Sequence, residues 1–321
     1  MDQETRFFAS ASAALTAYGR WFGPYPYGQL TIVDAAYLSG SGGMEYPMLV
    51  TAGTRWLAPQ AVAEPESTVA HEVGHQFWYG LVGSNEVEHA WMDEGVNQFS
   101  QTRLYDTGAL REVVVRRFFG GFIPWTVPGL RITRPIGEGA AAYREDAATD
   151  DLGTASYRYA PGTGTSITYF KTALWLHTLE RWLGWDRLQA SMSAYFRTWA
   201  YRHPRPDDFL SALPHAAQPR LAAFNDAVQH SAVFDYAVES LASTRTRDGR
   251  TRTTVVASRI GDGTFPVDVV TTFDDGTTKT EHWDGVDRRV TYVYEGPSRA
   301  ASSEVDPQRV LLLDTHRLNN S

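Results

Sequence analysis

The pattern of the sequence changes near residue 243 of its 321 residues, and this change restricts the fold more than any other feature. Residues 65–243 have mainly helical periodicity. Residues 244–252 are charged and turn-prone, and short apolar runs separated by Asp-Gly turns follow them, as in β-hairpins. A helical region followed by a strand region is typical of an α+β fold. We therefore expect two domains, residues 1–243 and residues 244–321.

The individual elements follow from periodicity and from helix and turn signals. Upstream of residue 65 we expect a helix at 7–18 and strands at 29–38 and 48–52, with a turn over 39–43. Further helices are expected at 65–80, 93–108, 166–183 and after Asp186. Five strands are expected at 253–258, 265–273, 277–283, 290–295 and 310–314. Five short strands joined by tight turns predict a small β-sandwich.

The composition excludes several classes of function. A hydrophobic fraction of 43% is typical of a packed globular protein. A formal charge of −8 and the lack of a basic patch argue against nucleic-acid binding. The chain has no cysteine, so any metal site must use His and carboxylate ligands.

Neither end of the sequence identifies a compartment. No apolar run approaches the roughly 18 residues that a membrane span needs, so we expect a soluble chain without a span. Residues 1–6 lack the basic and then apolar pattern of a signal peptide. A helical pattern begins almost at once, as in the middle of a longer protein, so we expect further domains outside this sequence.

Residues 69–79 read VAHEVGHQFWY and carry a metal-binding pattern. Residues four apart lie on one face of a helix, so His71 and His75 can bind one ion. Glu72 lies one position round the helix, where it can reach a metal-held water as a general base. The alternative is a helix whose two histidines form local hydrogen bonds.

Glu94 is the candidate third ligand, because catalytic zinc has three protein ligands and an open position. Eighteen residues separate it from His75, and it begins the next predicted helix. Gly74 and Gly95 would let the two helix backbones approach. Alone, Glu94 would be a first-turn acid favoured by the helix dipole. We expect Asp93 to cap this helix.

These residues resemble the zinc aminopeptidases typified by aminopeptidase N and the leukotriene hydrolase, a gluzincin family. His71, Glu72, His75 and Glu94 fit its His-Glu-x-x-His, eighteen residues, Glu pattern. Residues 91–95 (WMDEG) resemble its Trp-Leu-Asn-Glu-Gly segment. The resemblance implies a thermolysin-like catalytic domain with one zinc ion.

Residues 42–46 (GGMEY) resemble the family's Gly-x-Met-Glu-Asn motif, with Tyr46 in place of Asn. The resemblance implies that Glu45 binds the substrate's free α-ammonium. The backbone of Gly42, Gly43 and Met44 would pair with an extended substrate. Without the resemblance, Glu45 would be an ordinary exposed acid after a glycine-rich turn.

Residues 169–171 (YFK) resemble the family's Tyr-x-Lys-Gly motif, with Thr172 in place of Gly. The resemblance implies that Tyr169 donates its hydroxyl to the oxyanion of the tetrahedral intermediate. On pattern alone, a tyrosine near a helix start is more often part of the core.

The resemblance implies hydrolysis of the N-terminal peptide bond of peptides with a free N-terminus. It covers residues 21–243 best, and the family's N-terminal β domain and large C-terminal helical domain have no counterpart in the sequence. Two alternatives stay open: an endopeptidase with the same zinc site, and a non-catalytic interaction scaffold.

Overall fold

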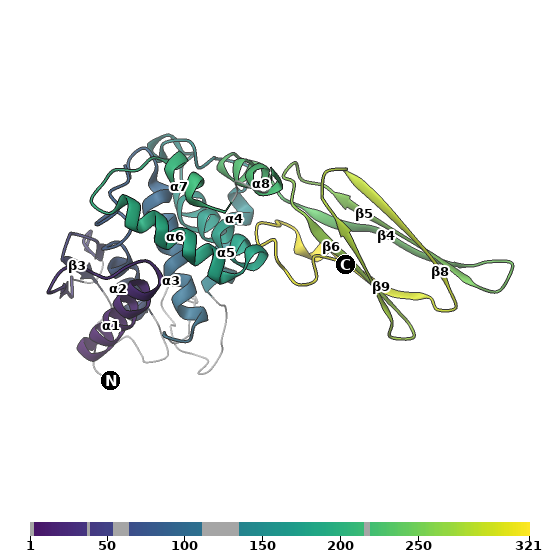
Figure 1. Cartoon of the computed structure of the whole chain (residues 1–321), viewed down its shortest axis with the longest axis horizontal. Coiled ribbons are helices and arrows are strands. Elements are labelled where there is room, and N and C mark those ends of the chain that lie inside the picture. Colours follow the sequence, from purple (N-terminus) through teal and green to yellow (C-terminus); the bar gives the residue numbers. More distant parts are fainter. Residues whose placement is uncertain (1–2, 37–38, 54–63, 111–134, 215–218) are drawn as a thin grey trace. The chain divides into compact units, whose positions relative to one another are not determined.

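The computed structural model describes residues 3–36, 39–53, 64–110, 135–214 and 219–321 (Figure 1). The chain forms two compact units, one of residues 1–143 and 152–214, the other of residues 144–151 and 215–321. The fold is of mixed α and β type. No described helix combines the length and the apolar character that crossing a bilayer requires.

The first unit is mainly helical, as predicted. Its first helix, α1 (Gln3–Trp21), is longer than the predicted 7–18 and buries Phe7, Ala11, Ala14 and Tyr18 on one face. The later elements are α2 (Glu64–Gly74), η1 (Trp91–Gly95), α3 (Val96–Asp106), α4 (Pro135–Asp146), η3 (Ser156–Arg158), η4 (Thr165–Lys171), α5 (Thr172–Leu183), α6 (Trp185–Trp199) and α7 (Pro206–Ala212).

Helix α2 ends at Gly74, earlier than the predicted residue 80. Tyr79 has a left-handed φ of 86°, and Gly80 N donates to His75 O at 2.8 Å, so the backbone turns here. The predicted helices at 93–108 and 166–183 are present. Their first turns, η1 and η4, are π-helical, a rare geometry that is frequent at functional sites.

A small sheet contacts α2 and has the strand order β1-β3-β2. Strand β1 (Thr31–Val33) runs parallel to β3 (Leu49–Ala52), and β2 (Gly43–Met44) pairs antiparallel with β3 at the edge. Both predicted strands are shorter than expected, and residues 37–38 of the first lie outside the described part. Strand β2 begins within the predicted turn, so that prediction was wrong at Gly43.

Aromatic side chains form a core beside helix α2. Phe22 packs edge-on against Trp78, with ring centroids 4.6 Å apart, and Tyr18 packs edge-on against Phe77. Phe196 of α6 completes this cluster against Trp78. All of these residues are buried, so the end of α2 is held from both sides by α1 and α6.

The second unit contains α8 (Pro219–Gln229), a short 3₁₀ turn (Arg317–Asn319) and two three-stranded antiparallel sheets. Strands β4 (Tyr236–Arg245), β5 (Thr251–Arg259) and β8 (Arg289–Gly296) form one sheet. Strands β6 (Val267–Phe273), β7 (Thr278–Trp283) and β9 (Ala300–Val305) form the other. The predicted face-to-face sandwich stays a prediction.

Two predictions in this region were wrong, one of a connector and one of a strand. Strand β4 crosses the predicted division at residue 243, and the supposed connector 244–252 contains the turn and the flanking strand ends of the β4–β5 hairpin. Residues 310–314 form turns rather than a strand, because the Asp306 carboxylate accepts hydrogen bonds from Val310 N and Leu311 N. The last strand, β9, had too weak an apolar pattern to be predicted.

Candidate metal centre and active site

His71 and His75 lie one turn apart on α2 and its C-terminal end, and their rings point to one place. Their Nε2 atoms are 3.2 Å apart. His75 is 1% exposed, whereas His71 is partly exposed. The i, i+4 spacing that the sequence predicted therefore brings the two nitrogens together.

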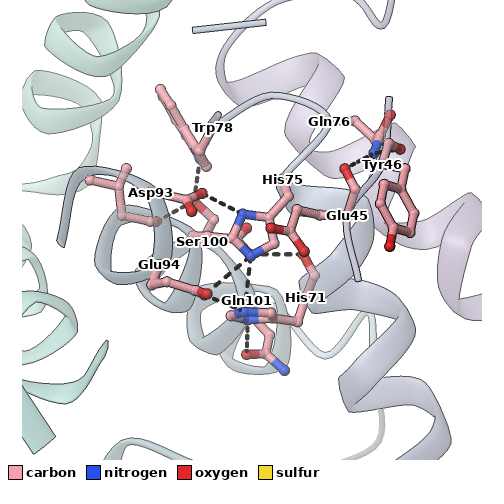
Figure 2. Close-up of polar contacts among 12 residues, drawn as sticks. Glu45, Tyr46, His71, His75, Gln76, Trp78, Asp93, Glu94, Ser100 and Gln101 are labelled. Carbon is pink, nitrogen blue, oxygen red and sulfur yellow. Dashed lines mark hydrogen bonds and ion pairs between the residues drawn. The ribbon is translucent and has the colours of Figure 1, made fainter. Parts of the chain in front are cut away.

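Glu94 enters from η1 and completes the group (Figure 2). Its Oε2 lies 3.0 Å from His71 Nε2 and 3.2 Å from His75 Nε2. The structure thus brings together the three predicted ligands, and one atom from each could hold a metal ion.

Gln101 of α3 determines which His71 nitrogen is free. The Gln101 Nε2 donates to Ser67 O at 2.8 Å and to Ser67 Oγ at 2.7 Å. Its Oε1, 3.2 Å from His71 Nδ1, is therefore the acceptor. His71 then carries its proton on Nδ1 and presents a lone pair on Nε2.

Asp93 has the same effect on His75. Its Oδ1 lies 2.6 Å from His75 Nδ1, and both side chains are 1% exposed. The prediction that Asp93 caps a helix was wrong, because the residue lies within η1 and no side-chain cap is present there. The sequence analysis did not identify these contacts of Asp93 and Gln101 with the two histidines. The one feature that could have indicated the role of Asp93 is its position next to Glu94 in the sequence.

This donor set fits a cation such as zinc. Two imidazole lone pairs and a carboxylate oxygen meet within 3.2 Å, and imidazole and carboxylate are ligands that Zn²⁺ accepts. Burial lowers the pKa of His75, but the Asp93 and Glu94 carboxylates outweigh it and raise this pKa well above its ordinary value. The site therefore attracts positive charge.

Glu72 is buried beside the three ligands, 6% exposed. Burial raises its pKa to about 7, although both ligand histidines oppose this. Strand β2 passes directly over it: a Cβ on Gly43 would lie 2.7 Å from Glu72 Oε1. The edge strand β2 and the candidate base Glu72 are therefore in close contact.

Glu45 follows β2, and its carboxylate lies within 4.8 Å of carboxylate oxygens of Glu86 and Asp93. Burial, followed by repulsion from Glu45 and Glu94, raises the pKa of Glu86. The result is a strongly negative region beside the metal ligands. The sequence did not predict that Glu86 lies near Glu45, because its position depends on the path of the loop before η1.

Tyr169 of η4 lies against the metal ligands, with its ring stacked on that of His71 at 5.8 Å between centroids. Burial and the neighbouring Glu94 carboxylate raise the pKa of Tyr169, so the hydroxyl keeps its proton and can donate.

The two glycines predicted at the helix crossing have different neighbours. A Cβ on Gly74 would lie 1.8 Å from Asn97 Oδ1 of α3, so Gly74 does permit the approach of α2 to α3. A Cβ on Gly95 would instead lie 2.4 Å from Thr172 Cβ. Gly95 therefore permits the approach of η1 to the η4–α5 helix, and the prediction that it faces α2 was wrong.

Several known proteins have sequences similar to this chain. "Aminopeptidase M1-B" of Oryza sativa subsp. japonica is 25% identical over 202 residues, which is 59% of this chain and 21% of that protein. The "Leukotriene A-4 hydrolase homolog" of Botryotinia fuckeliana is 26% identical over 194 residues, 59% of this chain and 28% of that protein. The chain is therefore similar in sequence to aminopeptidases and to a leukotriene A-4 hydrolase homolog. It spans only 21% and 28% of the lengths of these two relatives, and no family model matches it.

The fold has a counterpart among solved structures. Legionella pneumophila aminopeptidase A, crystallised with aspartic acid, superposes with a TM-score of 0.60 at 12% identity. The match covers 96% of this chain and 34% of the Legionella chain. At this identity the likeness concerns the fold alone.

Proposed function

We propose that this chain carries the catalytic centre of a zinc metallo-aminopeptidase, which hydrolyses the N-terminal peptide bond of peptides. The convergence of His71, His75 and Glu94 within 3.2 Å supports this most. In this proposal the three side chains hold one zinc ion in a thermolysin-like catalytic domain, which a small β-sandwich containing strands β4 to β9 follows.

Zinc, when bound, would supply Lewis acidity at an open coordination position. Glu72 accepts a proton from the attacking water and passes it to the leaving nitrogen. The protonated Tyr169 hydroxyl donates to the carbonyl oxygen as negative charge develops there.

Substrate orientation is assigned to Glu45 and the edge strand. Strand β2 pairs with β3 on one side, so its other main-chain edge can pair with an extended peptide. The Glu45 carboxylate, which directly follows β2, would pair with the α-ammonium of that peptide. Fixing the amine near the ligands lets only the first peptide bond reach the reacting groups.

The test is a panel of aminoacyl fluorogenic substrates, each with a free and an acetylated amine, cut by zinc-loaded wild type, Glu45→Ala and Glu88→Ala. We expect wild type and Glu88→Ala to cut only free-amine substrates and Glu45→Ala to lose the difference. Equal cleavage of both forms by wild type would favour the endopeptidase alternative. No cleavage by a zinc-loaded chain would favour the scaffold alternative.

A further inference from the structure

Gln76 directly follows the ligand His75 and is 2% exposed. Its Oε1 accepts a hydrogen bond from Met48 N at 2.8 Å. Its Nε2 donates to Tyr46 O at 3.1 Å and, at 3.4 Å, to Glu45 O (Figure 2). One buried amide therefore contacts three main-chain groups of residues 45–48.

Residues 45–48 join β2 to β3, and Met48 O accepts a hydrogen bond from Thr31 N of β1 at 2.9 Å. Met48 has a left-handed φ of 61°, which is unusual for a residue with a side chain. The Gln76 amide satisfies both a donor and an acceptor of this turn, as only a group with both functions can. The turn is thereby fixed to the segment that directly follows α2.

We propose that Gln76 is a positioning residue for the substrate amine, because it holds the backbone that carries Glu45 at a set distance from the ligand His75. The inference rests on the proposed function. Only a few covalent bonds separate an α-ammonium from the first peptide bond, so the ammonium partner and the metal ligands must keep their separation. A displacement of about 1 Å can cost on the order of a hundredfold in rate.

The experiment measures binding rather than turnover, in a zinc-loaded chain carrying Glu72→Gln so that peptides stay intact. Calorimetry compares a dipeptide amide with its N-acetylated form. In this background we expect Gln76→Met, which preserves side-chain length, to weaken binding of the free-amine dipeptide by about tenfold. Binding of the acetylated form should be unchanged, and zinc content should stay at one ion per chain.

Two further variants make the comparison specific. Gln76→Glu keeps an acceptor for Met48 N but places a carboxylate oxygen, instead of a donor, against Tyr46 O, so it should also weaken binding of the free-amine peptide and serves if Gln76→Met folds poorly. Gln189→Met is the matched control, because Gln189 Nε2 donates to a backbone carbonyl, Trp21 O, at 2.7 Å on another helix. It should change neither affinity.

Equal weakening of both peptides by Gln76→Met, or no weakening, would overturn the inference. Glu45→Ala in the same background separates this from failure of the proposed function. If Glu45→Ala leaves the preference for the free amine intact, the amine-binding role of Glu45 is wrong. If Glu45→Ala abolishes the preference and Gln76→Met does not reduce it, only the role of Gln76 is wrong.

Discussion

The Oδ1 atom of Asp93 lies 2.6 Å from Nδ1 of His75, with both side chains 1% exposed. This contact orients the ring, and it adds a buried negative charge behind a candidate metal ligand. Partners of this kind raise ligand basicity and fix the tautomer. Asp93 should therefore affect metal affinity without touching the metal.

Asp93→Asn should lower zinc affinity by about 10- to 100-fold, because the amide keeps the shape but removes the charge. Competition with a fluorescent chelator would measure the dissociation constant. Asp106→Asn, which removes an exposed carboxylate at the end of α3, is the control. An equal effect in both variants would mean that general charge, rather than the His75 contact, sets the affinity.

Glu94→Ala should abolish high-affinity zinc binding, a larger loss than that from Asp93→Asn, since it removes a ligand. Zinc at a thousand times its dissociation constant should stabilise the wild-type fold by about 4 kcal/mol, and this gain should vanish in Glu94→Ala. Thermal unfolding with and without zinc measures it. Glu88→Ala should keep the full gain, and a gain retained in Glu94→Ala would contradict the ligand assignment.

Zinc binding should weaken as the pH falls. The nearby Asp93 and Glu94 carboxylates overcome the effect of burial and raise the pKa of His75, so its ring holds a proton below this raised value. Zinc must displace that proton from Nε2, which costs up to tenfold in affinity per pH unit below the pKa. Calorimetry in buffers of different ionisation enthalpy should show proton release, and a pH-independent affinity between pH 5 and 7 would refute the competition.

Tyr169→Phe should lower kcat by about 10²- to 10³-fold with little change in KM, since the hydroxyl acts on charge that develops during the reaction. Steady-state kinetics on a free-amine substrate would show this. Tyr157→Phe, which removes a hydroxyl from a residue 60% exposed, should leave both constants unchanged. A rise in KM alone would place Tyr169 in substrate binding instead.

Several wrong expectations have a common cause. The π-helical turns η1 and η4 carry Glu94 and Tyr169, yet the sequence predicted ordinary helix starts there. A π-helical turn contains one more residue than an α-helical turn, and whether it forms depends on the neighbouring helix. Here η1 lies close to Thr172, an approach that Gly95 permits. The prediction of a strand at 310–314 was wrong for a similar reason, because the backbone N–H groups of Val310 and Leu311 donate to the Asp306 carboxylate.

The sequence by itself determined the features that depend on near neighbours: the helical first region, the β6–β7 hairpin of the second, and the convergence of His71 with His75. A four-residue spacing on a helix requires nothing from the rest of the chain. Tertiary structure alone decided that Asp93 and Gln101 orient the ligands, that Glu86 joins Glu45, and that Gln76 holds the turn before β3. These contacts depend on loop paths, and local periodicity does not encode them.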